Sequence, residues 1–295
     1  MGFDNAYEAL SDAGEDHRWA FGTGFHAPLS GVERALPAGA EPADLVAYCL
    51  MLADDALVMS HRLQEWLASA PELEEETALA NIGLDLLGQA RLLYARAGEA
   101  EGAGRDEDAF ALWRDEAEFR NVRLVEAPNA DFATLVVRLF LFSTWRLAVL
   151  SRLRRSRDAV LAAIAEKGVK ELTYHRDYAA EWVVRLGDGT ALSHERAEAA
   201  LAAVGPLAGE LTQASGPEQR LAAAGVTVDP GEVRAEVEDV VDEVLLEATL
   251  RWPLEAAVPP PGAPPRGRDG AHTEAMHGIL TEMQGLARAH PGARW

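Results

Sequence analysis

The chain has 295 residues, 48% of them hydrophobic, and its 48 acidic against 27 basic residues give a net charge of −21. This hydrophobic fraction is ample for a packed core and excludes a largely disordered chain. The negative charge repels phosphate backbones and argues against nucleic-acid binding. The single cysteine, Cys49, excludes a disulfide framework, and its apolar surroundings predict a buried core residue.

Residues 1–41 contain several glycines and prolines and show little periodicity, so we expect an irregular N-terminal extension. The first residues lack the basic region and apolar core of a secretory signal. No apolar run approaches about 20 residues without a charge. These features predict a cytoplasmic protein that does not bind a membrane.

From residue 42 onward the pattern becomes helical, and we expect residues 42–295 to form a single all-α domain. Apolar residues recur at three- and four-residue steps, which is typical of amphipathic helices. This spacing predicts four long core helices at about 44–69, 72–98, 131–155 and 158–186.

Additional helices are expected outside these four. A shorter one is predicted at about 108–122, and further helical patterns cover about 192–214, 230–250 and 271–289. Six prolines predict an extended, Pro-rich loop at 253–270, ahead of the C-terminal helix. The order of helix pair, long connection and helix pair favours a ferritin-like four-helix bundle.

A bundle of this topology can hold two metal ions, and that site has strict requirements. The usual ligands are a Glu from each of two helices and a Glu-x-x-His from each of the other two. The first helix offers Asp54, with His61 and Glu65 on the same stripe. The second offers Asp85 inside an apolar run, but Gly88 stands three residues later, where a histidine ligand is needed.

The fourth helix offers Glu171 and His175, which share a face but are spaced by four residues rather than three. The third helix decides the question, because no acidic residue lies between Asp131 and Asp158. It offers only the hydroxyls of Ser143 and Thr144 near its middle. A complete four-carboxylate site therefore cannot form from these helices.

We interpret Asp54, Asp85, Glu171 and His175 as a vestigial site that forms a buried polar or ion-pair network. A single structural metal ion and an oxygen-activating centre are the alternatives. No catalytic or cofactor-binding residue is assigned. The other histidines considered, His272 and His277, are expected at the surface or in an interface.

Four arginines close the third helix, at positions 152, 154, 155 and 157. Arginines at a helix C-terminus suit the helix dipole and solvent, which is the interpretation we favour. The alternative is a patch that binds the phosphates of a CoA thioester.

Residues 72–91 read ELEEETALANIGLDLLGQAR, and this segment resembles the C subunits of bacterial phenylacetyl-CoA 1,2-epoxidases. These enzymes are multicomponent monooxygenases of phenylacetate breakdown. Three further segments resemble the same family in the same order, and the likeness runs from about residue 45 to the end. They are 121–129, 170–190 and 272–295.

The resemblance implies a ferritin-like, structural, non-catalytic subunit with no cofactor of its own. It implies a homologous catalytic A subunit that holds the di-iron centre, together with a small B subunit and a reductase. The Pro-rich loop and the terminal Trp295 are candidates for binding this partner, or for folding back on their own bundle. The alternative function is a stand-alone ferritin-like di-metal oxidase or metal-binding protein.

Overall fold

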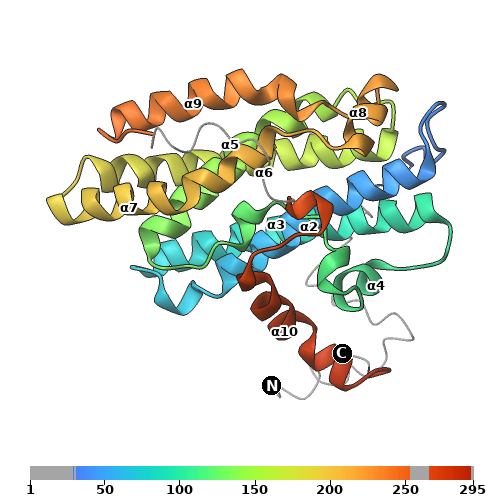
Figure 1. Ribbon diagram of the computed structural model, residues 1–295, viewed down its shortest axis with the longest axis horizontal. Helices are drawn as coiled ribbons and strands as arrows, with labels where there is room; N and C mark the ends of the chain where they lie inside the picture. Colours follow the sequence, from blue (N-terminus) through green and yellow to red (C-terminus); the bar gives the residue numbers. More distant parts are fainter. Residues whose placement is uncertain (1–28, 30, 253–265, 294–295) are drawn as a thin grey trace, which may run out of the picture. The chain divides into compact units, whose positions relative to one another are not determined.

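The computed structural model describes residue 29, residues 31–252 and residues 266–293 of the chain (Figure 1). Within these residues it contains nine α-helices and several short 3-10 turns, and no strand. The expectation of an all-α protein is confirmed. The helical fold belongs to the compact unit Glu33–Trp295.

Four long helices form the core of this unit. The first two pack against each other, and so do the last two, while the second also touches the fourth. A connection of about thirty residues joins the two pairs, which is the ferritin-type order of pair, crossover and pair. The helices are α2 (Pro42–Gln64), α3 (Leu73–Glu101), α5 (Phe132–Leu153) and α6 (Ala159–Gly187).

Local sequence explains where these helices begin and end. Pro42 stands at the first turn of α2, where its missing N–H costs nothing. Asp131 and Asp158 cap α5 and α6, because their side chains accept hydrogen bonds from Thr134 N at 2.8 Å and Leu161 N at 2.9 Å. Gly102 ends α3 in the left-handed conformation, at φ 69°.

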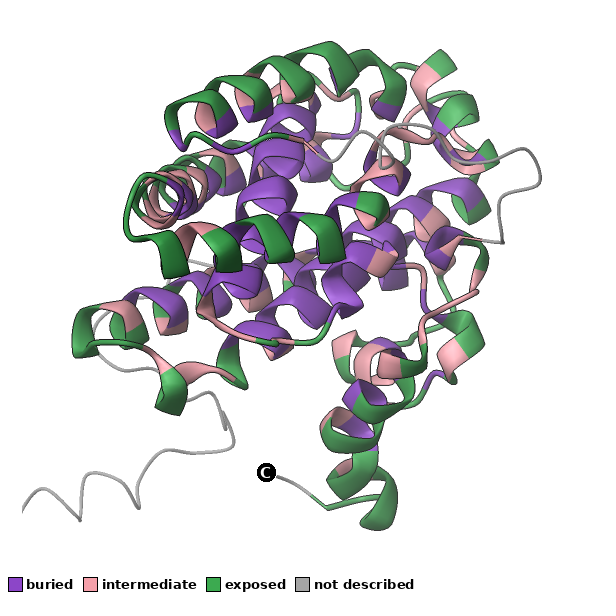
Figure 2. Cartoon of the chain, turned by 60° about the vertical axis from the view of Figure 1, so that its left-hand side comes forward, coloured by how far each residue is buried: buried purple, intermediate pink, exposed green. Residues whose placement is uncertain are grey.

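Buried residues concentrate in the core helices, above all in α5 (Figure 2). By length and composition α5 could cross a membrane, yet the rest of the fold buries nearly all of it, as expected for the central helix of a soluble bundle. Cys49 is fully buried on α2, as the sequence predicts.

Five shorter helices surround the core. Helix α7 packs against α5 and α6, α9 lies along the same pair, and α8 touches α2 (Figure 1). Helix α10 packs against α4 and the turns that follow it. Their bounds are α4 Glu107–Leu112, α7 Ala191–Ala208, α8 Gly216–Ala223, α9 Arg234–Glu247 and α10 Glu274–Ala289.

The helix expected at 108–122 is wrong beyond Leu112, where α4 ends. The chain continues through 3-10 turns at Glu116–Glu118 and Arg123–Glu126. In this segment backbone N–H groups donate to carboxylates of α2 instead of to carbonyls four residues earlier. The N–H of Arg120 and that of Val122 each lie 2.8 Å from such an oxygen.

Helix α8 is absent from the sequence prediction, although Ser215 and Glu218 form the capping box that announces it. Most of the expected N-terminal extension, most of the Pro-rich loop and Trp295 lie outside the described residues. Residues 31–40, the last part of that extension, contain turns and no helix.

Candidate functional site

The two neighbouring aspartates of α2 each bind an arginine from outside the core helices. Asp54 accepts hydrogen bonds from Tyr94 Oη at 2.5 Å and from Arg114, whose Nη1 lies 3.0 Å from Oδ2. Burial lowers the pKa of Arg114, but the charge and hydrogen bond of Asp54, together with Tyr94 and Glu118, raise it above its usual range. The carboxylate oxygens of Asp54 are therefore occupied by donors from the protein itself.

Asp55 is paired with Arg268, which precedes α10. Its Oδ2 lies 2.7 Å from Nη2 and its Oδ1 3.1 Å from Nη1 of that guanidinium. Arg268 also donates to the carbonyls of Met51 at 2.9 Å and Arg120 at 2.7 Å. Burial raises the pKa of Asp55, and the charge of Arg268 opposes this rise. We call Asp54, Asp55, Tyr94, Arg114 and Arg268 the α2 acid cluster.

The middle of α5 contributes a cation. Arg146 is fully buried, and its guanidinium donates from Nε to Gln89 Oε1 at 3.0 Å and from Nη1 to the Leu52 carbonyl at 3.1 Å. Burial lowers the pKa of Arg146 to about 10, with the charge of Asp55 opposing it, so the group stays protonated at neutral pH. The third core helix thus carries a buried positive charge and no acid, whereas each core helix of a di-metal bundle supplies a Glu.

A second polar region lies between α3 and α6. His175 is fully buried, and its Nε2 lies 3.1 Å from Asp85 Oδ2, whose side chain is 38% exposed. One turn away, Gln89 Nε2 donates to Glu171 Oε2 at 2.9 Å, and Lys167 also pairs with Glu171. We call Asp85, Gln89, Glu171 and His175 the α3–α6 seam.

The structure thus brings together three of the four residues expected in the vestigial site. Asp85, Glu171 and His175 line the α3–α6 seam, whereas Asp54 belongs to the α2 acid cluster. Across the described residues, three or more His, Cys, Asp or Glu bring ligand atoms within 4.8 Å of one another in one place, at His61, Glu65 and Glu282. The donors at the bundle centre do not fit a di-iron centre, since they face arginines and one another.

A buried ion pair lies just before the start of α10. His272 Nδ1 lies 2.7 Å from Glu126 Oε1, and its Nε2 lies 3.2 Å from the Phe119 carbonyl. Both partners are acceptors, so both ring nitrogens donate and His272 is an imidazolium. Burial lowers the pKa of His272, but the hydrogen bond and charge of Glu126 outweigh burial and raise it.

Of the two positions expected for His272, surface or interface, this pair shows the surface position to be wrong, because the side chain is fully buried. His277 is 85% exposed, as expected. The sequence interpretation also missed Arg146, Arg268 and Gln89. The signal available for Arg146 was its position: an arginine in the middle of an acid-free apolar helix is buried and needs partners from other helices.

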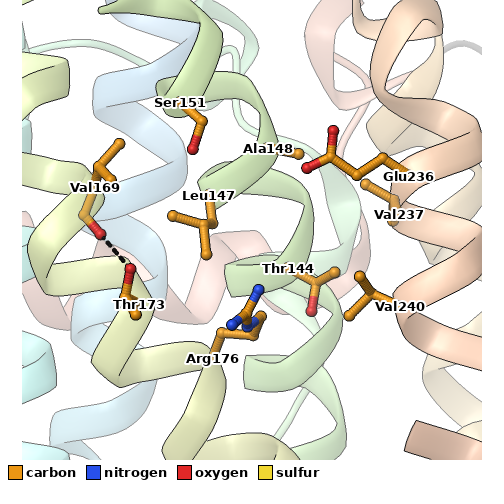
Figure 3. A pocket seen from close by; sticks show the side chains of 10 residues that line it. All are labelled: Thr144, Leu147, Ala148, Ser151, Val169, Thr173, Arg176, Glu236, Val237 and Val240. Atoms are coloured by element: carbon orange, nitrogen blue, oxygen red, sulfur yellow. Dashed lines mark hydrogen bonds between the residues drawn. The ribbon is translucent and has the colours of Figure 1, made fainter. Parts of the chain in front are cut away.

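A surface cavity of about 220 Å³ lies between α5, α6 and α9 (Figure 3). Thr144 and Arg176 extend toward it, and Glu236 approaches from α9, where it pairs with Arg152 at 2.6 Å. Pockets for drug-sized ligands measure roughly 300–1,000 Å³. Arg157, at the end of the arginine group, donates to the Ala224 carbonyl at 3.1 Å. These contacts favour the structural interpretation of the arginines over a CoA site.

Comparison with known proteins identifies the family of this chain. Residues 33–295 match the family described as phenylacetic acid catabolic protein. The chain is 44% identical over 251 residues to the C subunit of the 1,2-phenylacetyl-CoA epoxidase of Escherichia coli (strain K12). That match covers 85% of this chain and 99% of its relative. The chain therefore belongs to the phenylacetic acid catabolic protein family.

Proposed function

We propose that this chain is the C subunit of a phenylacetyl-CoA epoxidase in phenylacetate catabolism. In this role it is a non-catalytic, cytoplasmic bundle that binds the homologous catalytic A subunit, which holds the di-iron centre. The small B subunit and the reductase complete the assembly. The likeness to the C subunit of Escherichia coli, over nearly the whole length of that relative, supports this assignment.

The observation that carries the non-catalytic part of the proposal is Arg146. Two metal ions need about four carboxylates around them, and the third core helix supplies a guanidinium and no carboxylate. Here Arg146 reaches Gln89 and the α2 backbone from the helix that lacks an acid. Arg114 and Arg268 balance Asp54 and Asp55 in the same way. The chain thus neutralises the two α2 acids with arginines of its own.

A bundle that needs no metal can still serve catalysis in a complex. Packed against a catalytic subunit, a rigid helical body holds that subunit's ligand-bearing helices in place and excludes water from its substrate. The fully buried ion pairs suit this role, because they fix the relative positions of helices. They hold α2 to the connection through Arg114 and to the C-terminal segment through Arg268.

Co-purification with an iron assay on each separated chain tests the proposal. We expect the tagged chain to capture the catalytic A subunit and the iron to reside in that partner. The isolated chain should hold far less than one iron and show no turnover with phenylacetyl-CoA and a reductant. Two irons per isolated chain, with oxygen consumption in the absence of the partner, would contradict the proposal.

Matched variants make the assay specific. In a stand-alone metal enzyme, Asp85→Asn and His175→Ala would abolish iron binding while the fold survived. In the C subunit both changes should leave the iron content of the complex unchanged. Thr173→Ala, an exposed change on α6 near the seam, serves as the control for any general effect of substitution.

A further inference from the structure

Three potential metal ligands meet where α10 approaches α2, outside the α2 acid cluster and the α3–α6 seam. His61 Nε2 lies 3.5 Å from Glu65 Oε1, one turn along the same helix, and 3.4 Å from Glu282 Oε2 on α10. All three ligand atoms lie within 4.8 Å of one another. The sequence places His61 and Glu65 on one stripe but gives no reason to add Glu282, which is 217 positions after Glu65.

The spacing of these atoms resembles that of ligands around a small cation. His61 Nε2 is shielded from solvent and has no hydrogen-bond partner among the described residues. Zn²⁺ binds nitrogen and carboxylate oxygen at about 2.0–2.2 Å, so neighbouring ligands of a tetrahedral ion lie about 3.3–3.5 Å apart. The two separations from His61 Nε2, 3.4 and 3.5 Å, fall in this range.

The surroundings hold one ligand in place and leave another free to adjust. Arg62 Nη1 lies 2.9 Å from both oxygens of Glu65, and Asn129 Nδ2 donates to Oε2 at 3.2 Å. Ligating carboxylates in proteins are commonly held by such outer hydrogen bonds. The side chain of Glu282 is 69% exposed, so it can move onto an ion without opening the core.

We propose that His61, Glu65 and Glu282 bind a single divalent transition-metal ion of the Zn²⁺ type, with solvent in the remaining position. A neutral imidazole and two carboxylates balance the charge of such an ion, and one nitrogen with two oxygens is a donor set that Zn²⁺ accepts. The ion links α10 to α2 and so fastens the C-terminal helix to the bundle. The rival arrangement is an imidazolium of His61 between two glutamates, which needs no metal.

Zinc titration of the purified full-length chain, followed by calorimetry, tests the site. We expect one Zn²⁺ per chain in the wild type and at least a tenfold weaker affinity in both His61→Ala and Glu282→Gln. His277→Ala and Glu274→Gln are the matched controls, since both residues are exposed on α10 and neither belongs to the cluster. The controls should bind zinc as the wild type does.

A second readout separates a structural link from loose binding. Zinc should raise the melting temperature of the wild type and of both controls, because an ion that binds only the folded chain stabilises it. It should not raise that of Glu282→Gln, whose exposed position makes misfolding no explanation. Equal zinc affinity in the wild type, His61→Ala and Glu282→Gln would overturn the proposal and leave the imidazolium pair.

This inference is independent of the proposed function, and the two can fail separately. Measuring iron in the Glu282→Gln background removes the α10 site from the assay of the bundle centre. Iron that stays bound to the isolated Glu282→Gln chain would contradict the proposed function. Loss of zinc binding in the same variant would support the α10 site and leave the proposed function untouched.

Discussion

Asp54 and Asp55 on α2 and Asp85 on α3 belong to one bundle but are held in different ways. The two α2 carboxylates are fully buried, and each is paired with an arginine that is itself buried. Asp85 is 38% exposed and faces a histidine. The α2 acid cluster therefore depends on its arginines, whereas the seam keeps one side open to water. An acid in a ferritin-like core can thus either form a fully buried ion pair that holds helices together or remain partly solvated.

Removing one member of the α2 acid cluster should have the largest effect. Asp54→Ala leaves Arg114 charged and unpaired in the core, and we expect the free energy of unfolding to fall by about 3–5 kcal/mol. Urea denaturation measures this change. Glu107→Ala is the control, since Glu107 on α4 is 32% exposed and pairs with Arg91, which is 64% exposed. It should cost less than about 1 kcal/mol. Equal losses in the two variants would erase the distinction between buried and exposed pairs.

The Glu126–His272 pair should make the stability of the folded chain depend on pH. The folded-state pKa of His272 is raised, so its contribution is complete below the unfolded value of about 6.5. It is lost as the pH rises through the raised pKa. We expect the melting temperature of the wild type to fall over that range relative to His272→Gln, which does not titrate. Parallel curves for the two proteins would contradict the imidazolium assignment.

Within the seam, His175→Ala should have an intermediate effect. The change leaves a gap at a fully buried position but leaves Asp85 in contact with water, so no charge is stranded in the core. We expect a loss of roughly 1–3 kcal/mol in urea denaturation. A loss as large as that of Asp54→Ala would show that the seam is as closed as the α2 acid cluster.

Asp85→Asn should have the smallest effect. The amide keeps a hydrogen-bonding group beside His175, and the exposed side of the residue is solvated in either form. We expect a change below about 1 kcal/mol. Thermal unfolding of the variant beside His175→Ala measures the difference, and a larger loss for Asp85→Asn than for His175→Ala would reverse the proposed order.

The core helices could be predicted from the sequence because their information is local. The apolar periodicity of α3 and the capping aspartates of α5 and α6 place these elements within a few residues. The segment after Leu112 could not be predicted in this way. Its backbone donates to Asp54 and Asp55, about 66 residues earlier in the chain. A helical pattern in the sequence cannot reveal such a distant competitor for its hydrogen bonds.

The candidate site shows the same limit. The absence of an acid from the third helix is readable in the sequence and led directly to the idea of a bundle without a full ligand set. The pairing of these acids with arginines is not readable, because Arg114 lies 60 residues from Asp54 and Arg268 lies 213 residues from Asp55. Only the folded chain shows which base pairs with which acid.

The pairing of Asp55 with Arg268 also bears on how the protein is made. Asp55 leaves the ribosome 213 residues before the arginine with which it pairs. Until Arg268 arrives, the bundle must either keep a charged carboxylate in contact with water or hold it protonated. The buried pair can therefore form only after Arg268 has been synthesised. A chain truncated after residue 252 would contain all four core helices and lack the arginine that pairs with Asp55.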